Sequence, residues 1–166
     1  FLLMSGCFGH LHYADENLRA AVLVLRNSLM AWFKQRRVVY PHENLTEISD
    51  LTVKMVGSRD KQKLKTKGAE TWAISLFLID QLRRLGHVTG PDHVRLLHAG
   101  ECLQRMVQIW NAHSWTIPEA EQEQLFAHYN THIALMAPFE VYTPKHHIIF
   151  HLLAKIGYQG NPREYA

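Results

Sequence analysis

Cysteine is scarce in this chain: Cys7 and Cys102 are the only two among 166 residues. Two cysteines so far apart in the sequence supply neither a disulfide framework nor a four-ligand zinc site. Their scarcity favours a protein of a reducing, intracellular compartment.

Long apolar runs are also absent, since no stretch approaches the roughly 20 residues that a membrane-spanning helix needs. Residues 1–4 are apolar, but they lack the basic start and the length of a signal peptide. We therefore expect no membrane partner. The first residue is not methionine and the last residues stop within a motif, so we expect a piece of a larger protein.

The sequence signatures of common enzymes are missing as well. The chain has no phosphate-binding glycine loop, no nucleophile elbow and no dinucleotide-binding fingerprint. Neither His-Glu-x-x-His nor Glu-x-x-His occurs, which excludes the zincin and di-iron bundle patterns. These absences lead us to expect no catalysis by this chain alone and no cofactor within it.

Helical periodicity dominates what is present. Apolar residues recur at spacings of three and four, and proline, glycine and capping residues separate the periodic stretches. We find no alternating strand pattern and no repeat of fixed period. The sequence therefore predicts an all-α, bundle-like fold in a single domain over residues 1–166. The six expected helices span about residues 13–37, 43–56, 68–85, 91–110, 118–136 and 143–156.

Positive charge is concentrated in one place, residues 54–67, which we call the basic segment. The whole chain carries +3, yet six cations and one aspartate give the basic segment +5 and leave −2 for the rest. We expect residues 57–67 to form an exposed loop. Lysines attract DNA phosphates without reading sequence, but no aromatic residue interleaves to stack on bases; a solvated loop without a ligand explains the same charges. The cations are Lys54, Arg59, Lys61, Lys63, Lys65 and Lys67.

Twelve histidines raise the question of metal binding. The pairs His147/His151 and His128/His132 each have the one-turn spacing that places two imidazoles on one helix face. The first pair lies opposite the apolar stripe of its helix, so we expect it to face solvent or a partner. Because further ligand motifs are missing, a structural or interface role is favoured, and His147 and His151 remain the metal candidates.

Three other polar groups allow a catalytic and a structural interpretation. Asp80 lies within an apolar helix, and we expect it to pair with Arg83 or Arg84 one turn on. Glu70 suits the N-terminus of the same helix. Cys102 has only His98 as a nearby base, so a small buried thiol is favoured over a nucleophile.

Two stretches near the end of the chain resemble a known family. The first is Pro144-Lys145-His146-His147-x-x-x-His151-Leu152, and the second is Gly160-Asn161-Pro162-Arg163-x-Tyr165. Both are similar to segments of DDE-type transposase-like proteins of eukaryotic mobile elements. Residues 64–72 also look like the start of the long apolar helix in the helical insertion of those proteins. Together the resemblance covers about a quarter of the chain.

The resemblance implies that the chain is an all-α insertion within an RNase-H-like catalytic core. The first two catalytic aspartates would lie outside this chain, and the third acidic residue would follow Ala166. No catalytic residue would therefore be present here, and Mg²⁺ would serve the parent protein. The implied partners are DNA, the catalytic domain of the same polypeptide and a second copy, in the nucleus.

Two alternatives stay open. One is a helical protein-interaction module without a nucleic-acid role, which would associate through the exposed faces around His147 and His151. The other is a helical protein that binds metal through its histidines.

Overall fold

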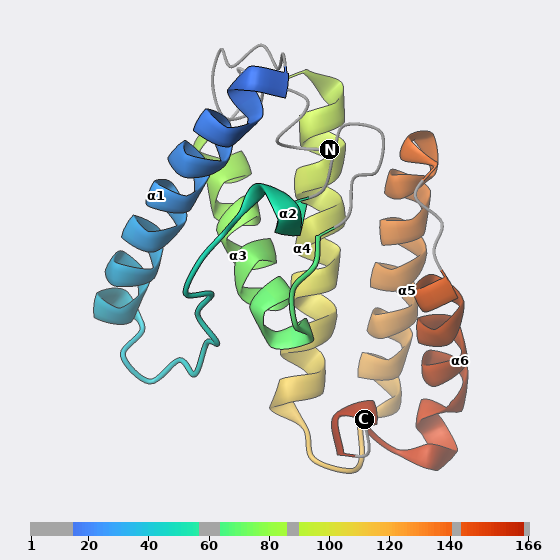
Figure 1. The fold of residues 1–166 in the computed structure, drawn as a ribbon. Helices are drawn as coiled ribbons and strands as arrows, with labels where there is room; N and C mark the ends of the chain where they lie inside the picture. Colours follow the sequence, from blue (N-terminus) through green and yellow to red (C-terminus); the bar gives the residue numbers. More distant parts are fainter. Residues whose placement is uncertain (1–14, 57–63, 86–89, 141–143, 165–166) are drawn as a thin grey trace. The chain divides into compact units, whose positions relative to one another are not determined.

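A computed structural model describes residues 15–56, 64–85, 90–140 and 144–164. The described residues form helices, turns and extended connections without a strand, so the predicted all-α class is confirmed (Figure 1). No helix among them is long and apolar enough to cross a membrane. The elements are α1 (Asp15–Val39), α2 (Val53–Val56), α3 (Gly68–Leu85), α4 (Pro91–Ala112), α5 (Glu119–Met136), the 3₁₀ helix η2 (Ala137–Phe139), α6 (Pro144–Gln159) and the 3₁₀ helix η3 (Pro162–Glu164).

The chain divides into two compact units, unit 1 (Phe1–Gly86) and unit 2 (His87–Ala166). Each unit has its own cluster of buried apolar side chains. The sequence predicts one domain over residues 1–166, and this stays a prediction.

Unit 1 is built around the apolar stripe of α1. Leu18, Val22, Leu25 and Leu29 recur at the spacing that puts them on one helix face, and that face is buried. α3 contributes the facing side of this core. Burial of each large side chain stabilises the unit by about 1.5–3 kcal/mol relative to exposure. The buried members are Leu18, Val22, Leu25, Leu29, Trp32, Phe33, Ile48, Leu51, Ala73, Ile74, Leu76 and Phe77.

The predicted second helix over residues 43–56 is wrong for most of its length, because only Val53–Val56 is helical. Leu45, Ile48 and Leu51 follow one another at a spacing of three, as in a helix, yet these side chains anchor a non-helical segment to the core of unit 1. Acidic residues of the segment are also held by arginines of α1. The ion pairs are Arg26–Asp50, Arg36–Glu43 and Arg37–Glu47.

Unit 2 consists of α4, α5 and α6, and α4 and α5 form its most extensive pairing. The apolar stripe predicted for α6 is confirmed: Leu153 and Ile156 are buried, and Ile149 packs against the same cluster. α5 ends at Met136, and Pro138 lies in the 3₁₀ turn that follows. The buried members of this core are Met106, Ile117, Leu125, Tyr129, Leu153 and Ile156.

Candidate functional site

The described part of the basic segment lies on two neighbouring stretches of unit 1. Lys54 belongs to α2, and Lys65 and Lys67 precede α3. The backbone N–H of Lys65 donates a hydrogen bond of 2.8 Å to the carbonyl oxygen of Met55. This bond brings the two ends of the basic segment together. Arg59, Lys61 and Lys63 belong to residues 57–63, which lie outside the described residues.

The three described lysines of the basic segment are exposed. Within the described ranges, none of them forms an ion pair with a carboxylate, in contrast to three arginines of α1. Their ammonium groups therefore remain available to an external anion. Lys65 and Lys67 lie in the part of the expected loop that the structure describes, whereas Lys54 lies on the short helix α2.

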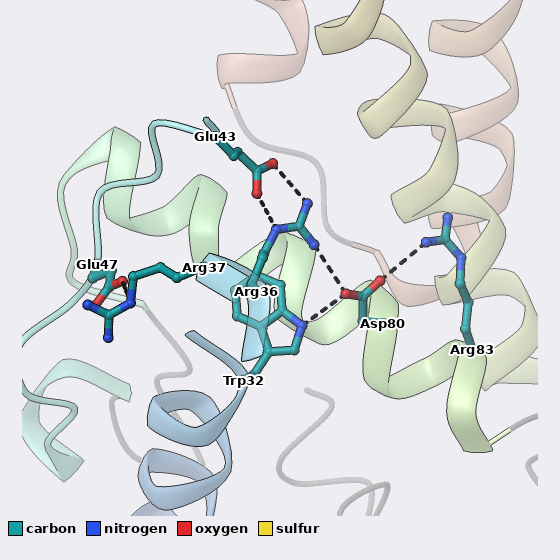
Figure 2. Close-up of polar contacts among 7 residues, drawn as sticks. All are labelled: Trp32, Arg36, Arg37, Glu43, Glu47, Asp80 and Arg83. Carbon is teal, nitrogen blue, oxygen red and sulfur yellow. Dashed lines mark hydrogen bonds and ion pairs between the residues drawn. The ribbon is translucent and has the colours of Figure 1, made fainter. Parts of the chain in front are cut away.

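The most extensive polar network of unit 1 surrounds Asp80 of α3 (Figure 2). The indole Nε1 of Trp32 donates to Oδ2 at 2.9 Å, and Arg36 Nη1 donates to the same oxygen at 3.3 Å. Arg83 Nη1 donates to Oδ1 at 3.3 Å. The predicted pairing with Arg83 is thus confirmed, while the bonds from Trp32 and Arg36 were not expected from sequence.

Arg36 extends this network to Glu43, which it binds through Nε and Nη2, the latter at 2.9 Å (Figure 2). Its guanidinium carbon lies 4.8 Å from the ring centroid of Trp32 and 4.9 Å from that of Tyr40, so cation–π attraction adds to the ion pairs. The hydrogen bond with Glu43 raises the pKa of Arg36, and the charges of Glu43 and Asp80 add to it against the opposing effect of burial. The network is structural: its carboxylates are already matched by cations.

Glu70 fulfils the structural role expected from its position. Its Oε2 accepts a hydrogen bond of 2.9 Å from the backbone N–H of Lys67, at the start of α3. This is one half of a capping box, in which a glutamate reaches back to an otherwise unpaired N–H group.

Over the described ranges, no group of three or more His, Cys, Asp or Glu residues could hold a metal ion.

Burial also argues against a nucleophilic role for Cys102. Desolvation raises the pKa of its thiol, and the neighbouring Glu101 carboxylate raises it further. A thiol with a raised pKa is a poor nucleophile at neutral pH, because the reactive form is the thiolate. His98, the only base expected nearby, is exposed, whereas Cys102 is buried.

The first family-like stretch begins α6. Pro144 occupies the first helical position, as predicted; the side chains of Pro144 and Lys145 are outside the described set, as is Tyr165. His147 and His151 are both exposed, which confirms the predicted orientation of this pair.

The second family-like stretch folds into a turn that docks on the C-terminus of α4. Gly160 has φ of +83°, a backbone conformation that residues other than glycine rarely adopt. A Cβ atom at this position would also lie 2.8 Å from the carbonyl oxygen of Trp115. Only glycine fits both the backbone conformation and the close approach.

Asn161 fixes this turn and is the residue that sequence reasoning missed. Its side chain is fully buried, and Nδ2 donates to the carbonyl oxygens of Trp110 at 2.8 Å and His113 at 2.9 Å. Its Oδ1 accepts from the backbone N–H of Arg163 at 3.1 Å. The last carbonyls of a helix have no partner within the helix, so Asn161 acts as a distant cap for α4.

The neighbouring residues complete the cap. Pro162 is buried, and Arg163 Nη1 donates to the carbonyl oxygen of Asn111 at 3.3 Å. The Gly-Asn-Pro-Arg run therefore has a structural reason to occur in this order. The only sequence signal for it was the resemblance itself, because the α4 carbonyls lie about 50 positions earlier in the chain.

The pair His128/His132 differs in exposure from the pair His147/His151. His132 is buried, and its Nδ1 lies 2.9 Å from the carbonyl oxygen of Ala99. Since a carbonyl only accepts, Nδ1 carries the hydrogen. Desolvation lowers the pKa of His132, and the nearby His146 lowers it further, against the opposing effect of the bond to Ala99. His128 and His132 thus do not present a shared exposed face.

Comparisons of the chain with protein-family models, with curated proteins and with solved structures find no match.

Proposed function

We propose that this chain is a non-catalytic helical portion of a transposase-like protein, which scaffolds an RNase-H-like core and contacts the DNA backbone. The observation that carries the DNA contact is the hydrogen bond from Lys65 to Met55. It joins the ends of the basic segment, so that Lys54, Lys65 and Lys67 extend from adjacent stretches as exposed, carboxylate-free cations among the described residues.

The chemistry of these side chains fits backbone contact rather than base recognition. Lysine is a point charge without the planar fork with which arginine reads guanine. Three arginines of α1, Arg26, Arg36 and Arg37, are engaged by carboxylates of the same unit. The remaining attraction is electrostatic and independent of DNA sequence.

The scaffolding role is supported by the docked Gly-Asn-Pro-Arg turn. Asn161 and Arg163 tie the chain immediately after α6 to the C-terminus of α4. A segment that must deliver a catalytic acidic residue soon after this turn needs a fixed starting point, and the buried Asn161 supplies one.

DNA contact is tested by fluorescence anisotropy with a labelled duplex of about 20 base pairs across a salt series. The variant Lys54→Ala/Lys65→Ala/Lys67→Ala should bind more weakly and flatten the dependence of log K on log salt by about 0.9 for each lysine that contacts phosphate. Arg95→Ala/Arg105→Ala/Lys155→Ala is the control matched in charge and exposure, because it removes three exposed cations from unit 2, of which Arg95 is paired with Asp92.

Equal losses in both triple variants would show general attraction to a cationic protein, and unchanged binding in the first would refute the assignment. Replacing Lys61, Lys63, Lys65 and Lys67 by glutamate extends the test to two further lysines of the basic segment and should abolish salt-sensitive binding.

The transposase relationship has its own test, the coding sequence on either side of this chain. An acidic residue a few positions after Ala166, and strand-like segments with aspartates before Phe1, would support it. A stop codon directly after Ala166 together with a start codon directly before Phe1 would refute it.

A second function, protein–protein association, is favoured by the exposed apolar side chains of α6. Ile148 is 56% exposed and Tyr158 is 74% exposed. Light scattering of the wild type and of His147→Ala/His151→Ala tests it. A higher-order species that the double substitution dissociates would support association through this helix, and a monomer in both samples would exclude it.

A further inference from the structure

Two exposed imidazoles of α6 lie closer together than helical spacing alone requires. The Nε2 atoms of His147 and His151 are 2.8 Å apart, the ring centroids are 4.3 Å apart and the rings are nearly perpendicular at 86°. The ring of Phe150 lies edge-on to that of His151, with 5.8 Å between centroids, which restricts the His151 side chain. The two nitrogens share a hydrogen bond, so they face each other on the exposed side of the helix.

This separation, if it is kept when the hydrogen bond is replaced by a metal ion, matches one coordination geometry. With metal–nitrogen bonds of about 2.0–2.1 Å, two nitrogens 2.8 Å apart subtend about 85–90° at a shared metal ion. A tetrahedral ion would need the nitrogens roughly 3.3 Å apart at the same bond lengths. Angles near 90° belong to the square-planar and tetragonal sites that Cu(II) and Ni(II) prefer.

We propose that His147 and His151 form a surface binding site for a divalent transition-metal ion of tetragonal preference, Cu(II) or Ni(II). Each imidazole donates its Nε2 lone pair to the ion. The ring that carries its hydrogen on Nε2 in the free protein transfers it through solvent to its own Nδ1, so both bound rings are neutral Nδ1–H tautomers. The ion takes the place of the hydrogen that one Nε2 shares with the other in the free protein. This site is independent of the proposed DNA contact, which lies in unit 1.

The remaining coordination positions are open. No third His, Cys, Asp or Glu joins the pair within the described ranges, so water or a ligand from another molecule completes the shell. An open site of this kind resembles metal centres that exchange ligands more than structural centres closed by four side chains. Both histidines are exposed, so the ion reaches them without a change in the fold.

The pair His128/His132 has the same spacing on α5 but differs from His147/His151 in burial. His132 is buried and its Nδ1–H is bonded to the carbonyl oxygen of Ala99, whereas His128 is partly exposed. A metal ion in front of α5 could not reach both. Sequence spacing treats the two pairs alike, and only burial separates them.

Isothermal titration of tag-free, metal-stripped full chain with CuCl₂ or NiCl₂ tests the site. We expect one site per chain, and His147→Ala or His151→Ala should weaken its Kd by about tenfold or more. His128→Ala and His98→Ala are matched controls that remove other histidines of unit 2 and should leave the site unchanged. Circular dichroism confirms that the variants keep their helices.

The coordination geometry of the site is tested by comparing the affinities of Ni²⁺ and Zn²⁺. Cu²⁺ does not serve this comparison, because it binds most nitrogen sites more tightly than either ion, whatever their geometry. Tighter binding of Ni²⁺ than of Zn²⁺ supports the tetragonal site. Tighter Zn²⁺ binding overturns the metal assignment. Equal losses in His128→Ala and His147→Ala, or no loss in His147→Ala and His151→Ala, overturn the site.

Discussion

The two units differ in the polar contacts that hold their helices in place. Unit 1 contains 13 of the 18 lysines and arginines against eight acidic residues, so it carries +5; unit 2 has five cations and seven acids, so it carries −2. Nine of the 12 histidines lie in unit 2. Unit 1 is therefore richer in charged side chains that can form ion pairs than unit 2 is.

The contacts follow from this difference. Unit 1 ties its helices and connections with pairs such as Arg36–Glu43 and Arg36–Asp80, whose members are partly exposed. Unit 2 uses the side chains of Asn161 and His132 against backbone carbonyls, and both side chains are buried. Exposed pairs are screened by salt and contribute little each, whereas a buried amide that loses its partners is costly.

The largest effect should come from Asn161→Ala, because it removes three hydrogen bonds of a buried side chain and leaves two carbonyl oxygens of the α4 terminus without that partner. We expect unit 2 to lose about 3 kcal/mol of stability. Hydrogen exchange of the full chain, followed by mass spectrometry, should show faster exchange around residues 110–117 and 156–164. Equal acceleration in the helices of unit 1 would contradict a role confined to unit 2.

Gly160→Ala should follow, because φ of +83° and the 2.8 Å approach to the Trp115 carbonyl oxygen both oppose a side chain. The expected loss is about 1–3 kcal/mol. Urea denaturation followed by tryptophan fluorescence measures it. Gly68→Ala is the matched control, since a Cβ there meets nothing within 4 Å, and it should be neutral or slightly stabilising.

Asp80→Asn should cost unit 1 about 1–2 kcal/mol, since the charged partner of Arg36 and Arg83 is lost while Asn can still accept from Trp32. Denaturation midpoints at low and high salt distinguish this loss from a packing change. The wild type should lose more stability than the variant when salt is raised. A variant with the same salt response as wild type would show that the ion pairs contribute nothing.

His132 gives unit 2 a dependence on pH. Its pKa is lowered in the folded chain, so the unfolded chain binds the proton more readily and acid favours unfolding. Stability should be complete above the ordinary histidine pKa of about 6.5 and should fall below it by at most about 1.4 kcal/mol per pH unit until the folded-state pKa is passed. Denaturation curves from pH 7.5 to 5 should therefore be flatter for His132→Gln than for wild type. His128→Gln is the control, because it removes another histidine of α5 and leaves the bond between His132 and Ala99 in place.

The smallest effect should come from Arg37→Ala. The pair with Glu47 is 3.2 Å long, but the arginine side chain is 65% exposed. We expect less than about 0.5 kcal/mol. A thermal melt resolves this against the larger change in Asp80→Asn. A loss as large as in that variant would contradict the distinction between the exposed ion pair of Arg37 and the less exposed ion pairs of Arg36.

Local features of the fold were predictable from sequence. The start of α6 at Pro144, the role of Glu70 at the start of α3 and the pairing of Asp80 with Arg83 all concern residues within one turn of each other. At that range helix geometry leaves few alternatives. The prediction of a helix over residues 43–56 was wrong because Ile48 and Leu51 have a helical spacing in the sequence, while contacts with α1 and α3 bury them in a non-helical segment.

The candidate sites were predictable only in part. The basic segment and the His147/His151 pair are visible as charge and spacing, and the described lysines and both histidines are exposed as expected. The arginine that links Trp32, Glu43 and Asp80 was not foreseen, because its partners lie seven and 44 positions away. Asn161 was hidden for the same reason, since its acceptors lie 48 and 51 positions earlier.

The sequence by itself determined the all-α class, the ends of most helices and where charge is concentrated, because these depend on neighbours within a few residues. Tertiary structure decided which arginines are neutralised, which histidine pair stays exposed and why Gly160 and Asn161 stand side by side. Those outcomes depend on burial and on backbone groups distant in the chain, since a polar group is stabilised or penalised by the partners that folding brings to it.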